Sequence, residues 1–232
     1  MLILRGLIGG LFQVALFGFL LLVPAGVVPG GTWYWPRALL FLGVYGGVMV
    51  VCIVVLAIKA PASLEARLKP LASKKQPMSD RIVTIVLFLW CIGWFVSIPI
   101  DVFYWTLLPT PGFVTSVFGA ALSVAGFALI MAAIYENSFA APIVEDQTDV
   151  GQVLVDTGPY AHVRHPLYLG FLPFAAGISL WLESYTSLMV ASGLLLVLIA
   201  RLVVEEQTLR QTLSGYSEYT EKVPYRLVPF VW

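Results

Sequence analysis

The chain contains little charge and few residues that bind metal. Only 11% of its 232 residues are Asp, Glu, Lys or Arg, whereas soluble domains average about 25%. The 13 basic and 13 acidic residues balance, so net charge gives no reason to expect a nucleic acid as partner. Cys52 and Cys91 stand inside apolar runs, where packing residues are expected rather than a disulfide. Their spacing from the two histidines builds no zinc site, and we predict no metal.

Long apolar runs account for most of the sequence. The chain is 59% hydrophobic, with a mean hydropathy of +0.91. A helix that spans a membrane needs about 20 mostly apolar residues. Four runs reach that length and two are shorter; they cover residues 6–28, 36–58, 82–108, 112–134, 167–182 and 186–204. We therefore predict an all-α, polytopic membrane protein with about six transmembrane helices.

The two ends of this helical series have their own features. Glu183 and Ser184 are the polar break between the last two runs, which predicts a tight helical hairpin. The first run follows Arg5 and has some features of a signal peptide. Its length and the spans behind it favour an uncleaved anchor.

Basic residues predict the orientation. The loop at 59–81 contains Lys59, Arg67, Lys69, Lys74, Lys75 and Arg81. By the positive-inside rule this loop is cytoplasmic. Counting outward, both termini and the loop at 135–166 are then cytoplasmic as well. The loops at 29–35, 109–111 and 183–185 fall on the opposite side and contain no Lys or Arg.

We divide the chain into two regions. Residues 1–135 form four spans and the basic loop, and residues 136–232 carry the polar clusters. The first cluster, 158–170, holds both histidines. Its Gly158-Pro159 reads as a turn, and Pro166 is suited to begin a helix whose amino terminus would favour a carboxylate. Two interpretations stay open: a membrane-edge anchor that meets lipid headgroups, or a binding site.

The second cluster lies at the end of the last apolar run. Arg201 and Glu205 are four residues apart and share a helix face, while Glu206 points elsewhere. The pair is either an intrahelical salt bridge of small energetic value or a ligand site. In that site Glu205 accepts an ammonium and Arg201 grips a carboxylate or phosphate. Asp101, near the outer end of the third run, reads as an interfacial residue.

Short motifs follow one another from about Asn137 to Pro229. They are Gln152-Val153-Leu154-Val155, Gly158-Pro159-Tyr160, Arg164-His165-Pro166-Leu167-Tyr168-Leu169-Gly170, Arg201 with Glu205-Glu206, Tyr216-Ser217-Glu218-Tyr219 and Val223-Pro224. In this order they resemble the isoprenylcysteine carboxyl methyltransferases and their phospholipid methyltransferase relatives. The first 130 residues match only as a pattern of membrane helices.

The resemblance implies an S-adenosylmethionine-dependent methyltransferase whose cofactor site faces the cytoplasm. Arg201 matches a family arginine that contacts the substrate carboxylate, and Glu205 would bind the cofactor amino group. Glu145 and Gln152 depart from the prenylcysteine enzymes, which have a glutamine and a histidine at these positions. From the clusters and the resemblance together, we predict cofactor contacts at Gln152, Val153, Leu154, Val155, Tyr160, His162, His165, Pro166, Leu167, Tyr168, Glu205 and Glu206.

The expected acceptor is a membrane lipid or a lipidated small molecule. A carboxylate such as a prenylcysteine-like acid needs no general base, whereas a phospholipid amine must lose a proton to a group such as Glu205 or Glu206. Two alternatives stay open. Membrane sterol reductases carry a similar arginine-histidine-proline-tyrosine motif and bind NADPH, and a non-enzymatic scaffold would keep the fold alone.

Overall fold

The computed structural model describes residues 1–69, 76–140 and 151–232 and is helical, with no strand in those ranges. Five helical segments are long and apolar enough to cross a membrane. They are α1 (Leu2–Val27), α2 (Pro36–Lys59), α4 (Met78–Ile100) with its π-helical extension η1 (Asp101–Trp105), α5 (Phe113–Glu136), and α7 (Tyr185–Ser192) with α8 (Leu194–Thr212). A sixth apolar helix, α6 (Pro166–Trp181), is shorter. The predicted all-α membrane protein with about six spans is confirmed.

Prolines set the start of several helices. Pro36, Pro61 and Pro166 each occupy the first position of a helix, where the missing N–H costs nothing. The short helix α3 (Pro61–Arg67) lies in the predicted basic loop. Two further short elements, the 3-10 helix η3 (Gly158–Ala161) and α9 (Tyr216–Lys222), belong to the carboxyl-terminal region.

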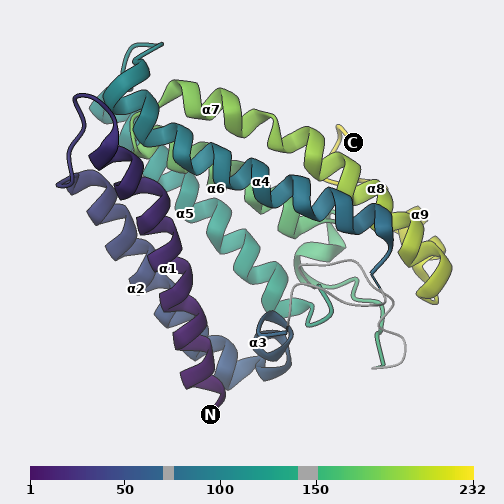
Figure 1. The fold of residues 1–232 in the computed structure, drawn as a ribbon. Coiled ribbons are helices and arrows are strands. Elements are labelled where there is room, and N and C mark those ends of the chain that lie inside the picture. The colour runs from purple at the N-terminus through teal and green to yellow at the C-terminus, as the bar shows by residue number, and fades with distance from the viewer. Residues whose placement is uncertain (70–75, 141–150) are drawn as a thin grey trace.

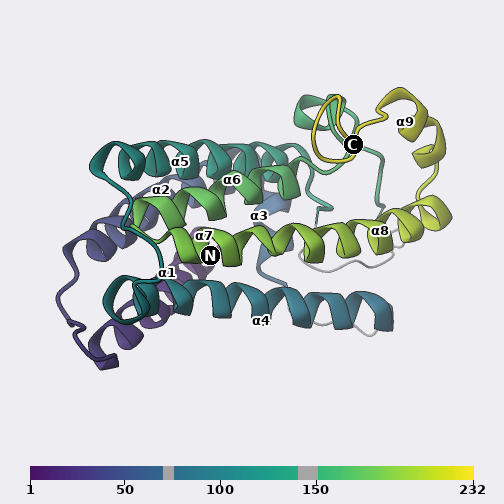
Figure 2. The ribbon, with the colours of Figure 1, turned by 90° about the horizontal axis from the view of Figure 1, so that it is seen from above.

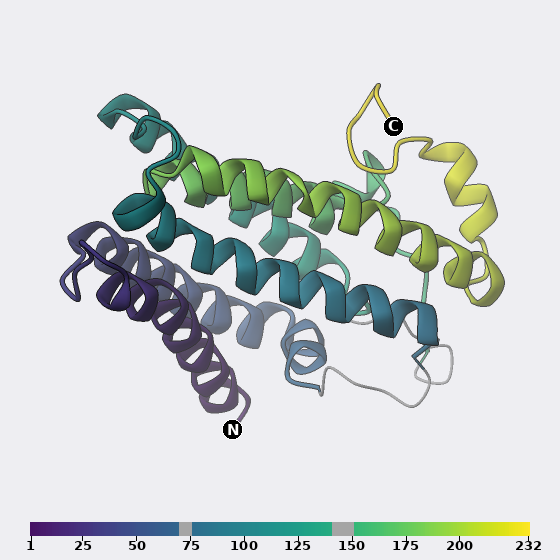
Figure 3. The same cartoon turned by 45° about the horizontal axis from the view of Figure 1, so that its top comes forward.

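The connections between the helices separate into two ends of the molecule. Figure 1 shows the links at 28–35, 101–112 and 182–184 gathered at one end, from which the helices diverge. The amino terminus and α3 lie at the far ends of α1 and α2, and α9 lies beyond the far end of α8. This grouping matches the alternation expected from six spans. Figure 3 shows α4 running beside α7 and α8, with α1 and α2 packed together next to them.

Glycines allow α5 and α6 to approach closely, side by side in Figure 2. A Cβ on Gly126 would lie 2.4 Å from the backbone nitrogen of Phe174, and one on Gly177 would lie 2.4 Å from that of Ser123. Small residues at such contacts permit backbone-to-backbone packing, on which membrane helices depend because lipid supplies no hydrophobic drive between them. This close contact between the two helices, the α5–α6 seam, holds the beginning of α6 against the end of α5.

The turn between α6 and α7 differs in part from expectation. The predicted hairpin has its turn at residues 182–184, and Ser184 caps α7 by accepting a hydrogen bond from the Ser187 backbone N–H at 2.9 Å. Asp101, which we expected at the interface, is only 4% exposed. It accepts a hydrogen bond from the Ser184 hydroxyl at 2.7 Å, so it fastens η1 to this turn.

We predict that Gly126→Ala weakens the α5–α6 seam, because its new methyl group meets backbone atoms that cannot rotate away. Overpacking of this kind costs about 1–3 kcal/mol, and we expect the upper part of that range in the thermal unfolding of the detergent-solubilised protein. Gly47→Ala is the matched control, since a Cβ there meets nothing within 4 Å. Equal unfolding temperatures for the two variants would contradict the claim that close packing at Gly126 stabilises the fold.

Candidate active site

A pocket opens where the carboxyl-terminal elements meet. It encloses about 660 Å³ of space, part of it open to solvent. The segment 152–155 and η3 form one wall, the first turn of α6 a second, and the end of α8 with α9 a third. Its wall comprises Asn137, Phe139, Ala140, Gln152, Val153, Leu154, Val155, Tyr160, Arg164, His165, Leu167, Tyr168, Glu205, Leu209, Leu213, Tyr216 and Tyr219. Aliphatic and aromatic side chains are the most numerous in this wall, and polar atoms contribute as much of its exposed surface as apolar atoms.

Glu205 is the carboxylate on this wall. Its side chain is 26% exposed, and it accepts a hydrogen bond from the Tyr168 hydroxyl at 2.5 Å. The His165 ring stacks on Tyr168 with centroids 5.5 Å apart, and its Nδ1 lies 3.9 Å from the same carboxylate oxygen. The position of Glu205 is thus fixed by the first turn of α6 and leaves part of the carboxylate open to the pocket.

Arg201 lies behind Tyr168, one helical turn from Glu205, and does not line the pocket. Its Nε donates to the Tyr168 hydroxyl oxygen at 2.8 Å. Because a guanidinium only donates, the Tyr168 oxygen accepts from Arg201 and its single proton points to Glu205. The hydrogen bonds of this row therefore run in one direction, from Arg201 to Tyr168 and from Tyr168 to Glu205.

The charge of Arg201 is compensated from α4. Its Nη1 donates to the Thr84 hydroxyl at 2.6 Å and lies 3.6 Å from the Asp80 carboxylate, and the two charged side chains are 2% and 0% exposed. We expected an acceptor anion or Glu205 as its partner. The structure differs, since Asp80 provides the buried carboxylate that the burial of a guanidinium requires.

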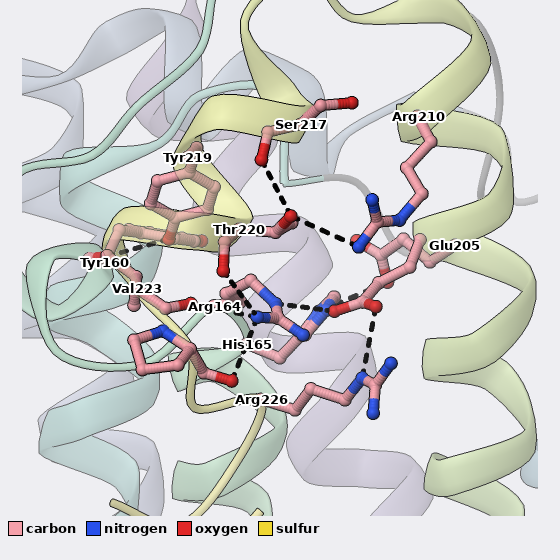
Figure 4. A network of polar contacts seen from close by, with 12 residues as sticks. Tyr160, Arg164, His165, Glu205, Arg210, Ser217, Tyr219, Thr220, Val223 and Arg226 are labelled. Atoms are coloured by element: carbon pink, nitrogen blue, oxygen red, sulfur yellow. Dashed lines mark hydrogen bonds and ion pairs between the residues drawn. The ribbon is translucent and has the colours of Figure 1, made fainter.

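A second buried arginine, Arg164, fastens the carboxyl-terminal tail (Figure 4). Its Nε donates to Glu206 at 2.7 Å, and its Nη1 donates to the carbonyls of Val223 and Pro224 at 2.9 and 3.0 Å. The side chains of Arg164 and Glu206 are each 5% exposed. Glu206 also lies 3.1 Å from Arg226 Nε. This acid thus joins three chain segments and is turned away from the pocket.

Backbone and side-chain contacts extend this connection. The backbone N–H groups of Arg164 and His165 donate to the carbonyls of Tyr225 and Arg226 at 2.9 and 3.0 Å. The Tyr219 hydroxyl donates to the Tyr160 carbonyl at 2.8 Å. Burial is the largest cause that raises the pKa of both phenols, so both stay protonated at neutral pH.

The structure brings most of the predicted cofactor residues together. Gln152, Val153, Leu154, Val155, Tyr160, His165, Leu167, Tyr168 and Glu205 lie on the pocket wall. The other three predicted residues lie off it. His162 is exposed, Pro166 is buried at the start of α6, and Glu206 is held by Arg164. Glu145 lies outside the described residues. The ligand contacts themselves stay predictions.

Several wall residues were missing from the predicted set. Leu209 and Leu213 follow Glu205 at intervals of four, so helical spacing from that acid indicated them. Tyr216 and Tyr219 belong to the motif Tyr216-Ser217-Glu218-Tyr219, which contributes to the resemblance but predicts no role for either residue. Asn137, Phe139 and Ala140 had no signal beyond their place at the start of the resembling segment.

Residues 114–215 match the family model for phospholipid methyltransferases. The resemblance predicted from the motifs is confirmed. The match begins at α5 and ends just before α9. It therefore includes the glycine seam and the pocket elements on α6 and α8 but none of α1 to α4. The predicted division at residue 135 stays a prediction.

Curated relatives match a little over a third of the chain. The chain is 32% identical over 84 residues to the protein-S-isoprenylcysteine O-methyltransferase of Schizosaccharomyces pombe and 38% identical over 91 residues to that of Saccharomyces cerevisiae. These segments cover 35% and 38% of this chain, and 36% and 38% of the relatives. A delta(14)-sterol reductase of Mus musculus is 36% identical over 90 residues, which cover 37% of this chain and 21% of the reductase.

A solved structure matches the fold over nearly the whole chain. The eukaryotic intramembrane Ras methyltransferase, an isoprenylcysteine carboxyl methyltransferase, superposes with a TM-score of 0.53 at 20% identity. The superposition covers 94% of this chain and 74% of that one. At this identity the likeness establishes the fold, and with the apolar helices it establishes an integral membrane protein.

We predict that Arg164→Gln loosens the tail, because Glu206 loses its closest buried cation and two carbonyls lose a donor. Removing one partner of a buried pair costs about 3–5 kcal/mol. Thermal unfolding and proteolysis after residue 222 measure the effect. Arg210→Gln is the control, since exposed Arg210 donates only to the Thr220 hydroxyl among the bonds described for it, at 3.2 Å. Similar losses in both variants would contradict the special role of Arg164.

Proposed function

We propose that this protein is an S-adenosylmethionine-dependent methyltransferase that methylates a lipid-soluble acceptor at the membrane surface. The observation that carries the proposal is Glu205, a carboxylate held in place by Tyr168 and partly open to a pocket that is rich in aromatic and aliphatic side chains. The matching family model and the yeast relatives support methyl transfer as the chemistry. The relatives are matched over little more than a third of their length, so the activity of this whole chain is part of the proposal.

The pocket residues fit this cofactor. Glu205 suits the ammonium of its amino-acid end, since a charge-assisted hydrogen bond to a carboxylate is among the stronger polar contacts. The Tyr216 hydroxyl is buried on the pocket wall without a hydrogen-bond partner among the described residues. A polar ligand group would satisfy it. Tyr160, Leu209 and Leu213 offer the flat and apolar surface that an adenine base and a sulfonium need.

The protein has little covalent chemistry to perform. The bound cofactor supplies a methyl group on a sulfonium that is already activated. The wall residues hold and orient the reactants and exclude water. The row Arg201, Tyr168, Glu205 keeps the carboxylate in one orientation, so Arg201 acts as a positioning residue in this proposal.

The nature of the acceptor sets the demand for a base. A carboxylic acid such as a prenylcysteine-like compound is already a nucleophile at neutral pH. A phospholipid amine must release a proton, and His165 on the pocket wall, with ring nitrogens 3.3 Å from Glu206 and 3.9 Å from Glu205, is placed to receive it. The proposal includes both acceptor classes.

A reductase is the second candidate, because the murine delta(14)-sterol reductase matches a similar share of the chain. A scaffold that keeps only the fold is the third. Binding of S-adenosylhomocysteine without binding of NADPH favours the methyltransferase, whereas the reverse favours the reductase. Binding of neither favours the scaffold.

We predict that Glu205→Gln weakens S-adenosylhomocysteine binding about ten- to a hundredfold, as the loss of one charge-assisted hydrogen bond of about 1.5–3 kcal/mol implies. Calorimetric titration of the detergent-solubilised protein measures this. Glu218→Gln removes an exposed carboxylate from α9 and serves as the control. Wild-type affinity in Glu205→Gln would remove this residue from the proposed site.

The proposed orientation puts the pocket and both termini in the cytoplasm. The basic loop at 59–81 and the absence of Lys and Arg from the loops opposite it support this orientation. Reporters inserted after residues 30 and 110 should report the outside, and those after 70, 150 and 232 the cytoplasm. An outside signal at 70 or 150 would reverse the assignment.

A further inference from the structure

Arg67, the last residue of α3, is a buried cation whose charge the described structure leaves unpaired. Its Nη1 and Nη2 are closed to solvent and have no hydrogen-bond partner. Burial lowers its pKa to about 10, which leaves the guanidinium charged at neutral pH. A buried donor without a partner costs free energy, and a buried charge without a counter-ion costs more.

Arg164 and Arg201, whose whole side chains are buried, are compensated. Arg164 lies against Glu206 at 2.7 Å, and Arg201 lies 3.6 Å from Asp80. Both therefore have a carboxylate from the protein itself. Arg67 is charged in the same way but is left for an anion from outside the described chain.

The position of α3 puts Arg67 beside the pocket. Leu64 of α3 is 4% exposed and belongs to one apolar cluster with Ile134, near the end of α5, and Leu167, which lines the pocket. Figure 1 shows α3 next to that end of α5. The charges of Arg67 and Glu205 act on the pKa of the same Tyr160 phenol, one lowering it and the other raising it. A positive and a negative group thus approach the pocket from different elements.

We propose that Arg67 binds the anionic oxygen group, a carboxylate or a phosphate, of the membrane-dissolved acceptor. The inference rests on the proposed methyltransferase function. A guanidinium presents two parallel donors to such groups. The acceptor rather than the cofactor is assigned here because the cluster around Leu64 also includes residues of the membrane helices α1 and α2, namely Leu2, Leu7, Ile53 and Leu56. An acceptor that leaves the lipid beside these helices meets Arg67 near its headgroup.

Three protein variants and two pairs of ligands test the assignment. Arg67→Met removes the charge but keeps an apolar side chain, Arg67→Lys keeps the charge without the paired donors, and Lys69→Met removes a neighbouring exposed charge as the control. N-acetyl-S-farnesylcysteine supplies a carboxylate, and its methyl ester is the matched uncharged ligand. Phosphatidylethanolamine in detergent micelles supplies a phosphate, and diacylglycerol in the same detergent is the uncharged match.

We expect Arg67→Met to raise the KM for at least one anionic acceptor about ten- to a hundredfold, as loss of a charged hydrogen-bond partner implies. S-adenosylhomocysteine affinity should stay within about twofold of wild type, because Arg67 is assigned to the acceptor and not to the cofactor. Loss of a charge-assisted hydrogen bond to the cofactor would lower the affinity by more than that. Binding of the uncharged ligands and the unliganded melting temperature should not fall. Arg67→Lys should lie between wild type and Arg67→Met, and Lys69→Met should match wild type.

Each other result overturns the inference in a recognisable way. An unchanged KM and unchanged binding of both anionic ligands show that Arg67 holds no acceptor. A tenfold loss of S-adenosylhomocysteine affinity assigns the anion to the cofactor. A lower unliganded melting temperature in both Arg67 variants makes the residue structural. Wild-type protein that binds S-adenosylhomocysteine but gains no melting temperature from either anionic ligand overturns this inference alone, whereas failure to bind S-adenosylhomocysteine overturns the proposed function.

Discussion

The buried pair of Arg164 and Glu206 is the interaction on which the pocket depends. Each side chain is 5% exposed, and together they join the start of α6, the carboxyl-terminal part of α8 and the tail after α9. The start of α6 and the end of α8 are walls of the pocket, and the tail holds them from outside it. Without the pair, the tail would leave two carbonyls and one carboxylate buried without their donor, so the pocket and the tail form together.

The amino-terminal helices contribute more than a path through the membrane. Asp80 and Thr84 of α4 neutralise and orient Arg201, which in turn sets the direction of the Tyr168 hydroxyl toward Glu205. The recognisable family segment begins only at residue 114. The arrangement of the proposed cofactor carboxylate therefore depends on side chains that lie outside this segment.

The sequence predicted the fold because apolar runs of the required length permit little else in a membrane, and motif order predicted most of the pocket wall. It failed where a contact depends on helix packing. Nothing near Arg201 indicated that Asp80, more than a hundred residues earlier, would compensate its charge. Likewise, Asp101 read as interfacial because its hydroxyl partner, Ser184, comes from a distant turn. The four-residue spacing of Glu205, Leu209 and Leu213 is local by contrast, and it would have indicated both leucines, which the prediction omitted.

The contact between Asp80 and Arg201 also limits how this protein can be recombined. A chimera that joins residues 114–232 to the spans of another membrane protein would keep every motif yet leave a guanidinium in the bilayer without its carboxylate. Such a charge is costly in hydrocarbon. The two halves of the chain must therefore be kept together. A replacement for the amino-terminal half needs a carboxylate at the position that Asp80 occupies in α4.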